Sequence, residues 1–229
     1  MAFRKKAAQI LALEPDLLIV PECECPERLE FAPSVQPPRD HLWIGDNPTK
    51  GIGIFSYSDL ALTLHELYDP TLRYVIPIKV SGRMHFNLLA IWAMDDKEDF
   101  GRNYIGQVWL AVNQYEALLD NSVLIVGDFN WNTIWDHSSR DLYGNLTQTV
   151  EFLTSKGVIS LYHSFFREEF GQETCPTLYM YRWSNKPYHV DYLFASMDFV
   201  NRLQSVEIGV YEDWKRLSDH MPVIATFER

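Results

Sequence analysis

The chain has 229 residues, enough for one domain with a substantial hydrophobic core, and we expect a single domain over residues 1–229. Apolar residues make up 47% of the sequence, which excludes a disordered protein. The formal net charge of -11 argues against a protein that grips long nucleic acid mainly through basic groups, because such proteins gain affinity by neutralising phosphates. Clustered acids can instead hold a divalent cation.

The sequence contains no apolar run of membrane-spanning length, and the N-terminus lacks the apolar core of a signal peptide. Three cysteines cannot form a disulfide framework and suit a reducing compartment. Cys23 and Cys25 have no second pair with which to bind zinc, so we expect buried thiols. We therefore predict a cytoplasmic protein with no membrane span, and the sequence indicates no obligate protein partner.

In the first half of the chain, apolar residues at helical spacing, ended by Pro15, predict an amphipathic helix over residues 3–13 with a basic outer face. The helix leads into a short apolar strand, Leu17–Val20, which ends at Glu22. A proline-rich, irregular stretch follows this strand. Four further strands are then predicted, at His41–Ile44, Gly51–Tyr57, Leu72–Val80 and Met84–Trp92.

In the second half, an apolar face predicts a helix over residues 104–119, and another over residues 146–156 closes at Gly157 in the position of a C-terminal cap. The apolar run Val123–Val126, bounded by turn formers, predicts a buried strand. Many strands with few long helices favour two packed sheets flanked by helices. The remaining strands are predicted at Val158–Tyr162, Thr177–Tyr181, Val190–Ala195, Ser205–Val210 and Val223–Phe227.

Acidic, amide or imidazole side chains stand at four strand ends or edges. After the strand at 123–126 the chain places Asp128 and Asn130 two positions apart, so both can face one cleft. Taken alone, the tripeptide Asp-Phe-Asn at 128–130 is also typical of an ordinary turn after a core strand. Because four ends carry such groups, the sequence predicts a functional site. The other three ends carry Glu22, the pair His189 and Asp191, and the pair Asp219 and His220.

These residue types are suited to metal-assisted phosphoryl chemistry. If Glu22, Asp128 and Asp219 converge, they form the oxygen ligand set that Mg²⁺ or Mn²⁺ prefers, and a bound cation polarises a phosphoryl oxygen. His220 could abstract a proton from water, or stay protonated and stabilise the transition state, if a carboxylate orients its ring. Adjacent side chains of an extended segment point opposite ways, so Asp191 suits this role better than Asp219.

The motifs together resemble a known family. GDFN at 127–130, HVDYLF at 189–194, LSDHMPV at 217–223 and the acid after Leu17–Val20 are similar to motifs of the endonuclease/exonuclease/phosphatase superfamily, which includes exonuclease III and deoxyribonuclease I. The similarity spans almost the whole chain. It implies an α/β fold, a four-layer αββα sandwich with two mixed β-sheets between helices. It also implies that the N-terminal strand of the family is missing here.

The resemblance carries functional roles over to individual residues. The implied catalytic residues are His220, Asp191 as the group that orients it, and Asp128 with Asn130, which act on the attacking water or leaving group and hold the phosphate. The implied metal site, for Mg²⁺ or Mn²⁺, consists of Glu22, Asp219 and Asp128. Glu24 would replace Glu22 if the strand register slipped.

Five residues are expected to contact substrate: Asn130, Trp131, His189, Trp92 and Trp183. Trp92 stands where exonuclease-III-like members carry a tyrosine hydroxyl, and indole offers only a differently placed donor. Trp183 lies in a loop with basic neighbours, where an aromatic ring could stack on a base. For Trp131 packing of the site wall is an equal alternative, and His189 is more typical of a packing residue.

The sequence thus predicts a divalent-metal-dependent phosphodiester hydrolase, and DNA is the substrate that the resemblance favours. A phosphatase or phosphodiesterase for a small or lipid phosphate is the alternative, which the acidic charge favours. A catalytically degenerate binding module is the alternative from another class, suggested by the missing strand.

Overall fold

A mixed six-stranded sheet lies at the centre of the computed structural model, which describes residues 3–29, 35–138 and 141–228. Its strands are β4 (Ala61–Leu64), β5 (Val75–Ser81), β6 (Phe86–Trp92), β7 (Val123–Asp128), β8 (Val158–Ser160) and β11 (Asp191–Ser196). They are ordered β4-β5-β6-β7-β11-β8. Only β6 and β7 run parallel among these neighbours. The β7–β11 pair positions the candidate site, because β7 ends and β11 begins there.

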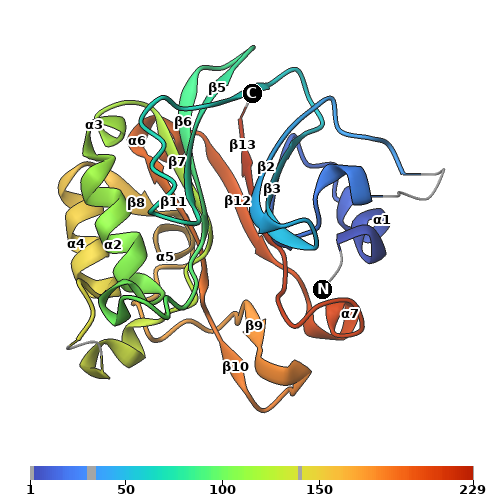
Figure 1. Cartoon of the computed structure of the whole chain (residues 1–229). Coiled ribbons are helices and arrows are strands. Elements are labelled where there is room, and N and C mark those ends of the chain that lie inside the picture. The colour runs from blue at the N-terminus through green and yellow to red at the C-terminus, as the bar shows by residue number, and fades with distance from the viewer. Residues whose placement is uncertain (1–2, 30–34, 139–140, 229) are drawn as a thin grey trace.

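Two antiparallel ladders pack on one face of this sheet (Figure 1). One ladder contains β1 (Leu17–Cys23), β3 (Lys50–Ser56) and β2 (Asp40–Asn47), and the other contains β12 (Leu203–Ile208) and β13 (Val223–Phe227). Buried aliphatic side chains such as Ile54, Ile78 and Leu88 fill the space between the layers. The apolar alternation of these strands therefore builds the core between the two sheet layers.

Helices cover both outer faces. Figure 1 shows α2 (Ile105–Gln114), α3 (Glu116–Leu119) and α4 (Leu146–Ser155) against the six-stranded sheet, and α1 (Ala7–Leu11) and α7 (Tyr211–Trp214) on the opposite side. The predicted order of four layers is confirmed. Among the helices of the described residues, none has the length and apolar character needed to cross a membrane. The shorter elements are the helices α5 (Leu161–Phe166) and α6 (Met197–Val200), the strands β9 (Leu178–Tyr179) and β10 (Pro187–Tyr188), and the 3-10 turns η1 (Phe3–Lys5), η2 (Pro26–Arg28), η3 (Phe100–Arg102), η4 (Thr133–Ser138) and η5 (Met180–Arg182).

Local capping explains where one prediction fails. The run Val158–Tyr162 is predicted as one strand, but β8 ends at Ser160 and α5 begins at the next residue. The Ser160 side chain accepts the backbone N–H of His163 and so caps the helix. The predicted helix over residues 104–119 is likewise divided, at Tyr115, into α2 and α3.

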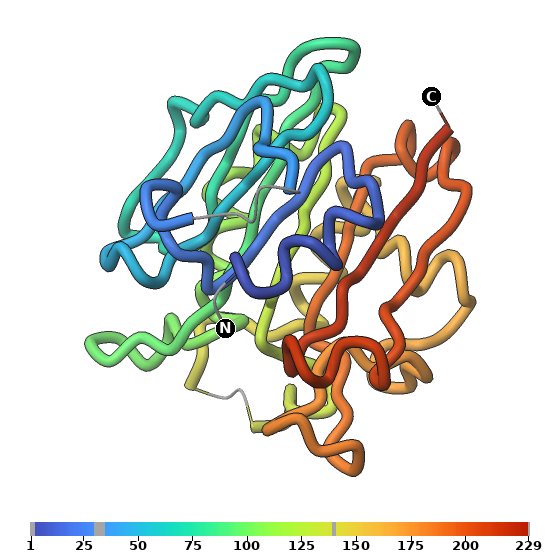
Figure 2. Tube along the Cα trace, turned by 90° about the vertical axis from the view of Figure 1, so that its right-hand side faces the viewer, coloured from blue at the N-terminus to red at the C-terminus, as the bar shows by residue number. Residues whose placement is uncertain are grey.

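A cavity of about 140 Å³ lies between β1 and β13. Residues Leu18 to Pro21 of β1 line one side, Val223 of β13 lines the other, and Val126 and Leu193 of the six-stranded sheet also line it. Within the described residues β1 pairs only with β3, and β13 only with β12. In Figure 2 the two strands, blue and red, run beside each other.

Candidate active site

A tight turn at the end of β7 builds the first part of the site. Gly127, the last residue of β7 before Asp128, has a φ of +145°, and a Cβ atom there would lie 1.9 Å from the Ile91 carbonyl oxygen of β6, so this strand position requires glycine. Asp128 follows and is buried. The backbone N–H of Asn130 donates to Asp128 Oδ1, and its side-chain Nδ2 donates to Asp128 Oδ2, both at 2.8 Å. The turn therefore fixes both oxygens of the Asp128 carboxylate.

Strand pairing brings the second carboxylate opposite the first. In the antiparallel register of β7 and β11, Asp191 pairs directly with Asp128, so their side chains share one face. The Thr177 hydroxyl accepts the Asp191 backbone N–H at 3.0 Å. A carboxylate from each of two central strands thus meets at the same edge of the sheet.

His220 completes the cluster. Its Nδ1 lies 2.8 Å from Asp191 Oδ2. An isolated bridge between Leu178 and His220 ties this segment to β9. Ligand-type atoms of Asp128, Asp191 and His220 all lie within 4.8 Å of one another. The His220 side chain remains 31% exposed, so a substrate can reach its ring.

The charges in this cluster are strongly coupled. Burial raises the pKa of Asp128 to about 8, and the Asp191 carboxylate adds to the effect while His220 opposes it. Burial by itself lowers the pKa of His220, but the carboxylates of Asp191 and Asp128 outweigh it and raise that pKa to about 10. His220 is therefore a cation at neutral pH, and Asp128 exchanges its proton close to neutral pH.

Glu22 lies at a distorted end of β1. The register shifts between Val20 and Cys23, and Glu22 itself has a positive φ of 57°. Its Oε1 atom forms an ion pair with Lys50 Nζ at 2.8 Å, and the Glu22 side chain is 43% exposed. Burial alone would raise its pKa, but the bond to Lys50 holds the pKa of Glu22 below its usual value. The charge of Glu22 still contributes to raising the pKa of Asp128, so the two carboxyl groups are close enough to interact electrostatically.

Glu24 is placed differently and does not compete for this role. It is 3% exposed and accepts the Phe3 backbone N–H at 2.7 Å and Arg4 Nη1 at 2.6 Å. Glu24 therefore fixes the N-terminal turn η1 to the end of β1. The strand register thus leaves Glu22 as the acid beside the site.

Asp219 is half-buried, and its carbonyl oxygen accepts the Tyr179 backbone N–H at 2.8 Å. Its carboxylate contributes to raising the pKa of His220. Lys6, which the sequence predicted on an outward basic face, instead lines the cavity with Asp191 and His220. Burial lowers the pKa of Lys6, while the charges of Asp219, Glu22 and Asp191 oppose that shift. An ammonium group thus faces the acids of the site, and the basic run near Phe3 was the only sequence signal for it.

The aromatic and imidazole candidates differ in how far they are exposed. Trp92 is 3% exposed and stacks on Tyr74 with ring centroids 5.2 Å apart. His189 is 3% exposed, and its Nδ1 lies 2.9 Å from the Cys175 carbonyl oxygen. Both are interior residues, and burial prevents them from contacting a substrate as predicted. Trp131 is half-buried and donates to Asp136 at 2.8 Å.

Trp183, in contrast, is 55% exposed on the hairpin formed by β9, η5 and β10. Lys186 Nζ lies 4.8 Å from the Trp183 ring centroid and 5.3 Å from that of Tyr181. The hairpin is tied to the site at Leu178 and Tyr179. Figure 1 shows it projecting from the body of the protein. An aromatic and cationic tip therefore projects from a hairpin whose base contacts the segment of Asp219 and His220.

The sequence matches no protein-family model and no curated protein, but the structure is similar to solved nucleases over nearly its whole length. A 3'-5' exonuclease, NExo, from Neisseria meningitidis is 19% identical with a TM-score of 0.63, over 100% of this chain and 96% of the other. An AP endonuclease from Archaeoglobus fulgidus is 16% identical, with a TM-score of 0.63 and coverage of 97% and 93%. The catalytic domain of Xenopus laevis APE2 is 14% identical, with a TM-score of 0.64 and coverage of 96% and 86%. The chain therefore has the fold of the exonuclease III-like AP endonucleases and related nucleases.

Proposed function

We propose that this protein is a divalent-metal-dependent phosphodiester hydrolase that acts on DNA. The observation that carries the proposal is the cluster of Asp128, Asp191 and His220 at the shared edge of two strands, with His220 Nδ1 bonded to Asp191. The fold supports it as well, because the similar structures are a 3'-5' exonuclease and AP endonucleases. Because one fold can carry many activities, the cluster is what indicates the reaction.

The donor set fits a hard divalent cation. Asp128 is a buried carboxyl group whose pKa is raised to about 8 by burial and by nearby Asp191 and Glu22, so the region carries more negative charge than its surroundings stabilise. Oxygen ligands with excess negative charge are what Mg²⁺ and Mn²⁺ prefer. Among the described residues, Asp128 has ligand atoms within 4.8 Å of those of Asp191 and His220, whereas Glu22 and Asp219 lie outside that group. Asp128 would therefore hold the ion, with Glu22 and Asp219 as its predicted further ligands. A bound ion would polarise a phosphoryl oxygen and stabilise charge on the leaving group.

The raised pKa values of His220 and Asp128 suggest which role each of them has in the reaction. His220, with a pKa of about 10, stays protonated at neutral pH and can donate to a phosphoryl oxygen or to the leaving group. Asp191 holds the ring in place for that donation. Asp128 would act on the attacking water or the leaving group once it is ionised, because a pKa of about 8 in the metal-free protein keeps most of this carboxyl group protonated at neutral pH. Asn130 orients the Asp128 carboxylate through two hydrogen bonds.

The hairpin tip favours a polymeric substrate. Exposed Trp183 and Tyr181, with Lys186 close to both rings, form a surface on which a base can stack beside a phosphate. The net charge of -11 is the observation that favours the alternative, a phosphatase or phosphodiesterase for a small or lipid phosphate. The dependence on salt concentration distinguishes the two proposed substrates. Affinity for duplex DNA falls steeply with ionic strength, whereas turnover of a small soluble phosphoester does not.

The proposal is tested by incubating the purified chain with plasmid, abasic-site duplex and a panel of phosphomonoesters, with Mg²⁺, Mn²⁺ or chelator. We expect cleavage of DNA only with metal, and none by Asp128→Ala. Cleavage of phosphomonoesters alone would favour the alternative. Absence of turnover on every substrate would leave a binding module.

All three cysteines are free thiols, and a cytoplasmic location stays a prediction.

Removal of the hairpin aromatic is expected to weaken DNA binding. Stacking of one base on an aromatic side chain contributes roughly 1–3 kcal/mol, so Trp183→Ala should raise the dissociation constant for single-stranded DNA about tenfold. The measurement is fluorescence anisotropy at fixed salt. Tyr143→Ala is the matched control, because Tyr143 is 54% exposed, much like Trp183, but lies outside the hairpin. Equal effects of the two substitutions would contradict a specific role for the hairpin.

A further inference from the structure

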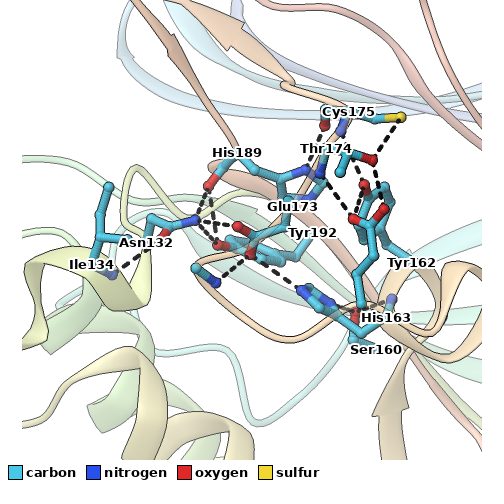
Figure 3. Close-up of polar contacts among 12 residues, drawn as sticks. Asn132, Ile134, Ser160, Tyr162, His163, Glu173, Thr174, Cys175, His189 and Tyr192 are labelled. Carbon is cyan, nitrogen blue, oxygen red and sulfur yellow. Dashed lines mark hydrogen bonds and ion pairs between the residues drawn. The ribbon is translucent and has the colours of Figure 1, made fainter.

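Asn132 lies in a buried polar network outside the catalytic cluster, shown in Figure 3. It is 2% exposed, and its Nδ2 is within donating distance of the His189 carbonyl oxygen (2.9 Å), Glu173 Oε2 (3.1 Å) and the Tyr192 hydroxyl (3.3 Å). Its Oδ1 accepts the Ile134 backbone N–H at 3.1 Å. Every polar atom of this amide therefore has a partner, which fixes its orientation.

Glu173 carries a charge into this network. Its side chain is 4% exposed, and its Oε1 accepts the Gly171 backbone N–H at 3.0 Å and lies 3.2 Å from His163 Nε2. His163 Nδ1 in turn lies 2.7 Å from Ser160 Oγ. Burial alone would raise the pKa of Glu173, but hydrogen bonds from His163, Gly171 and Asn132 outweigh it and lower that pKa to about 2. Glu173 is therefore ionised at neutral pH.

The hydrogen bonds link a serine to a histidine and the histidine to a carboxylate, as in a hydrolase triad: Ser160, His163 and Glu173. Their burial excludes that role. The His163 and Glu173 side chains are 8% and 4% exposed, and Ser160 is 5% exposed. A nucleophile must reach its substrate, and this serine caps a helix in the interior. The network must therefore act through what it holds in place.

What the network holds is the pair of strand ends that carry the catalytic acids. The β7–β11 ladder ends at the pair Asp128 and Asp191, with one further backbone hydrogen bond from the Phe129 N–H at 3.0 Å. Beyond that point the Asn132 side chain connects the two segments, because its Nδ2 donates a hydrogen bond to the His189 carbonyl oxygen on the opposite segment. Asn132 thus continues the connection between the two segments after the backbone ladder stops.

We propose that Glu173 is a positioning residue: its buried carboxylate orients Asn132, and Asn132 holds the two strand ends at the separation that keeps Asp128 and Asp191 together. The role rests on the proposed function. A carboxylate is required because both Glu173 oxygens accept hydrogen bonds, from Asn132 at one and from Gly171 and His163 at the other. A glutamine has one carbonyl oxygen, so its NH₂ group would face a donor.

Glu173→Gln is the first test. A misplacement of about 1 Å in a catalytic group can cost about 100-fold in rate, so we expect kcat to fall roughly tenfold or more, with KM changed less than about twofold. Glu168→Gln is the matched control. Glu168 lies in the same segment and accepts from the Tyr162 hydroxyl (2.7 Å) and the Thr174 backbone N–H (2.9 Å). We expect this control to keep the kcat of the unmutated chain.

Amide hydrogen exchange tests the positioning role without reference to activity. Glu173→Gln should speed exchange of the Phe129 amide, which bonds across the two strand ends, and should leave amides in the middle of β7 unchanged. Glu168→Gln should change neither. If the unmutated chain proves inactive on every substrate, the proposed function fails while this measurement still decides whether Glu173 holds the strand ends.

Asn132→Ala is the second variant, in case Glu173→Gln does not fold. It removes the bond to the His189 carbonyl but leaves Glu173 its bonds to Gly171 and His163. We expect the same fall in kcat and the same faster exchange at Phe129. Unchanged kcat and exchange in the folded variants would overturn the proposal. Equal loss in Glu168→Gln would overturn it too, because the effect would then be general destabilisation.

Discussion

Replacement of His220 by alanine is expected to lower kcat by about 10²- to 10⁴-fold, the usual contribution of a positioned acid or base. The expectation follows from its place in the cluster, with Nδ1 bonded to Asp191 and a side chain that is 31% exposed to an incoming substrate. Because the ring is not part of the hydrophobic core, the fold should survive. The measurement is single-turnover cleavage with saturating metal, together with the melting temperature.

Two comparisons make this test specific. Asp191→Asn keeps the size of the orienting side chain but removes its charge, so we expect the pKa of His220 to fall and the rate at neutral pH to drop with it. His85→Ala is the control, because His85 is exposed at the opposite end of β6, before Phe86. An alanine variant at His220 that retained full activity would contradict the proposed mechanism.

The sequence was sufficient to predict that Asp128 and Asp191 lie at the ends of two buried strands. An apolar run that stops at Gly127 and Asp128 indicates a buried strand and its end, and Asp191 begins another such strand. Antiparallel pairing of the two strands then places the acids directly opposite each other. This inference needs only local periodicity and the position of polar residues at strand ends, both of which a sequence displays.

Contacts between distant segments could not be predicted in this way. Lys50 binds Glu22 beside a shift in the register of the β1–β3 pairing, and no spacing in the sequence encodes that shift. Glu173 reaches Asn132 across 41 residues. Likewise, the burial of Trp92 and His189 depends on which segments pack above them, whereas the sequence shows only that aromatic and imidazole groups lie near strand ends.

Metal affinity is expected to depend steeply on pH through Asp128. A carboxylate binds a cation only when ionised, and burial raises the pKa of Asp128 to about 8 in the metal-free protein. Below pH 8 each bound ion must therefore displace a proton, so the apparent affinity for Mn²⁺ should rise about tenfold per pH unit between pH 6 and 8. Above pH 8 the group is already ionised, and the affinity should level off. Isothermal titration calorimetry at several pH values measures this directly.

Asp128→Asn supplies the matched variant, because asparagine has nearly the same shape but neither the charge nor the titrating proton. Loss of an outer partner of a metal ligand typically costs about 10- to 100-fold in affinity, so loss of the ligand charge itself should cost at least about 100-fold. The remaining affinity should no longer rise between pH 6 and 8. An asparagine variant that kept the affinity and the pH slope of the unmutated chain would show that the ion binds elsewhere. Glu22 and Asp219 would then be the residues to replace next.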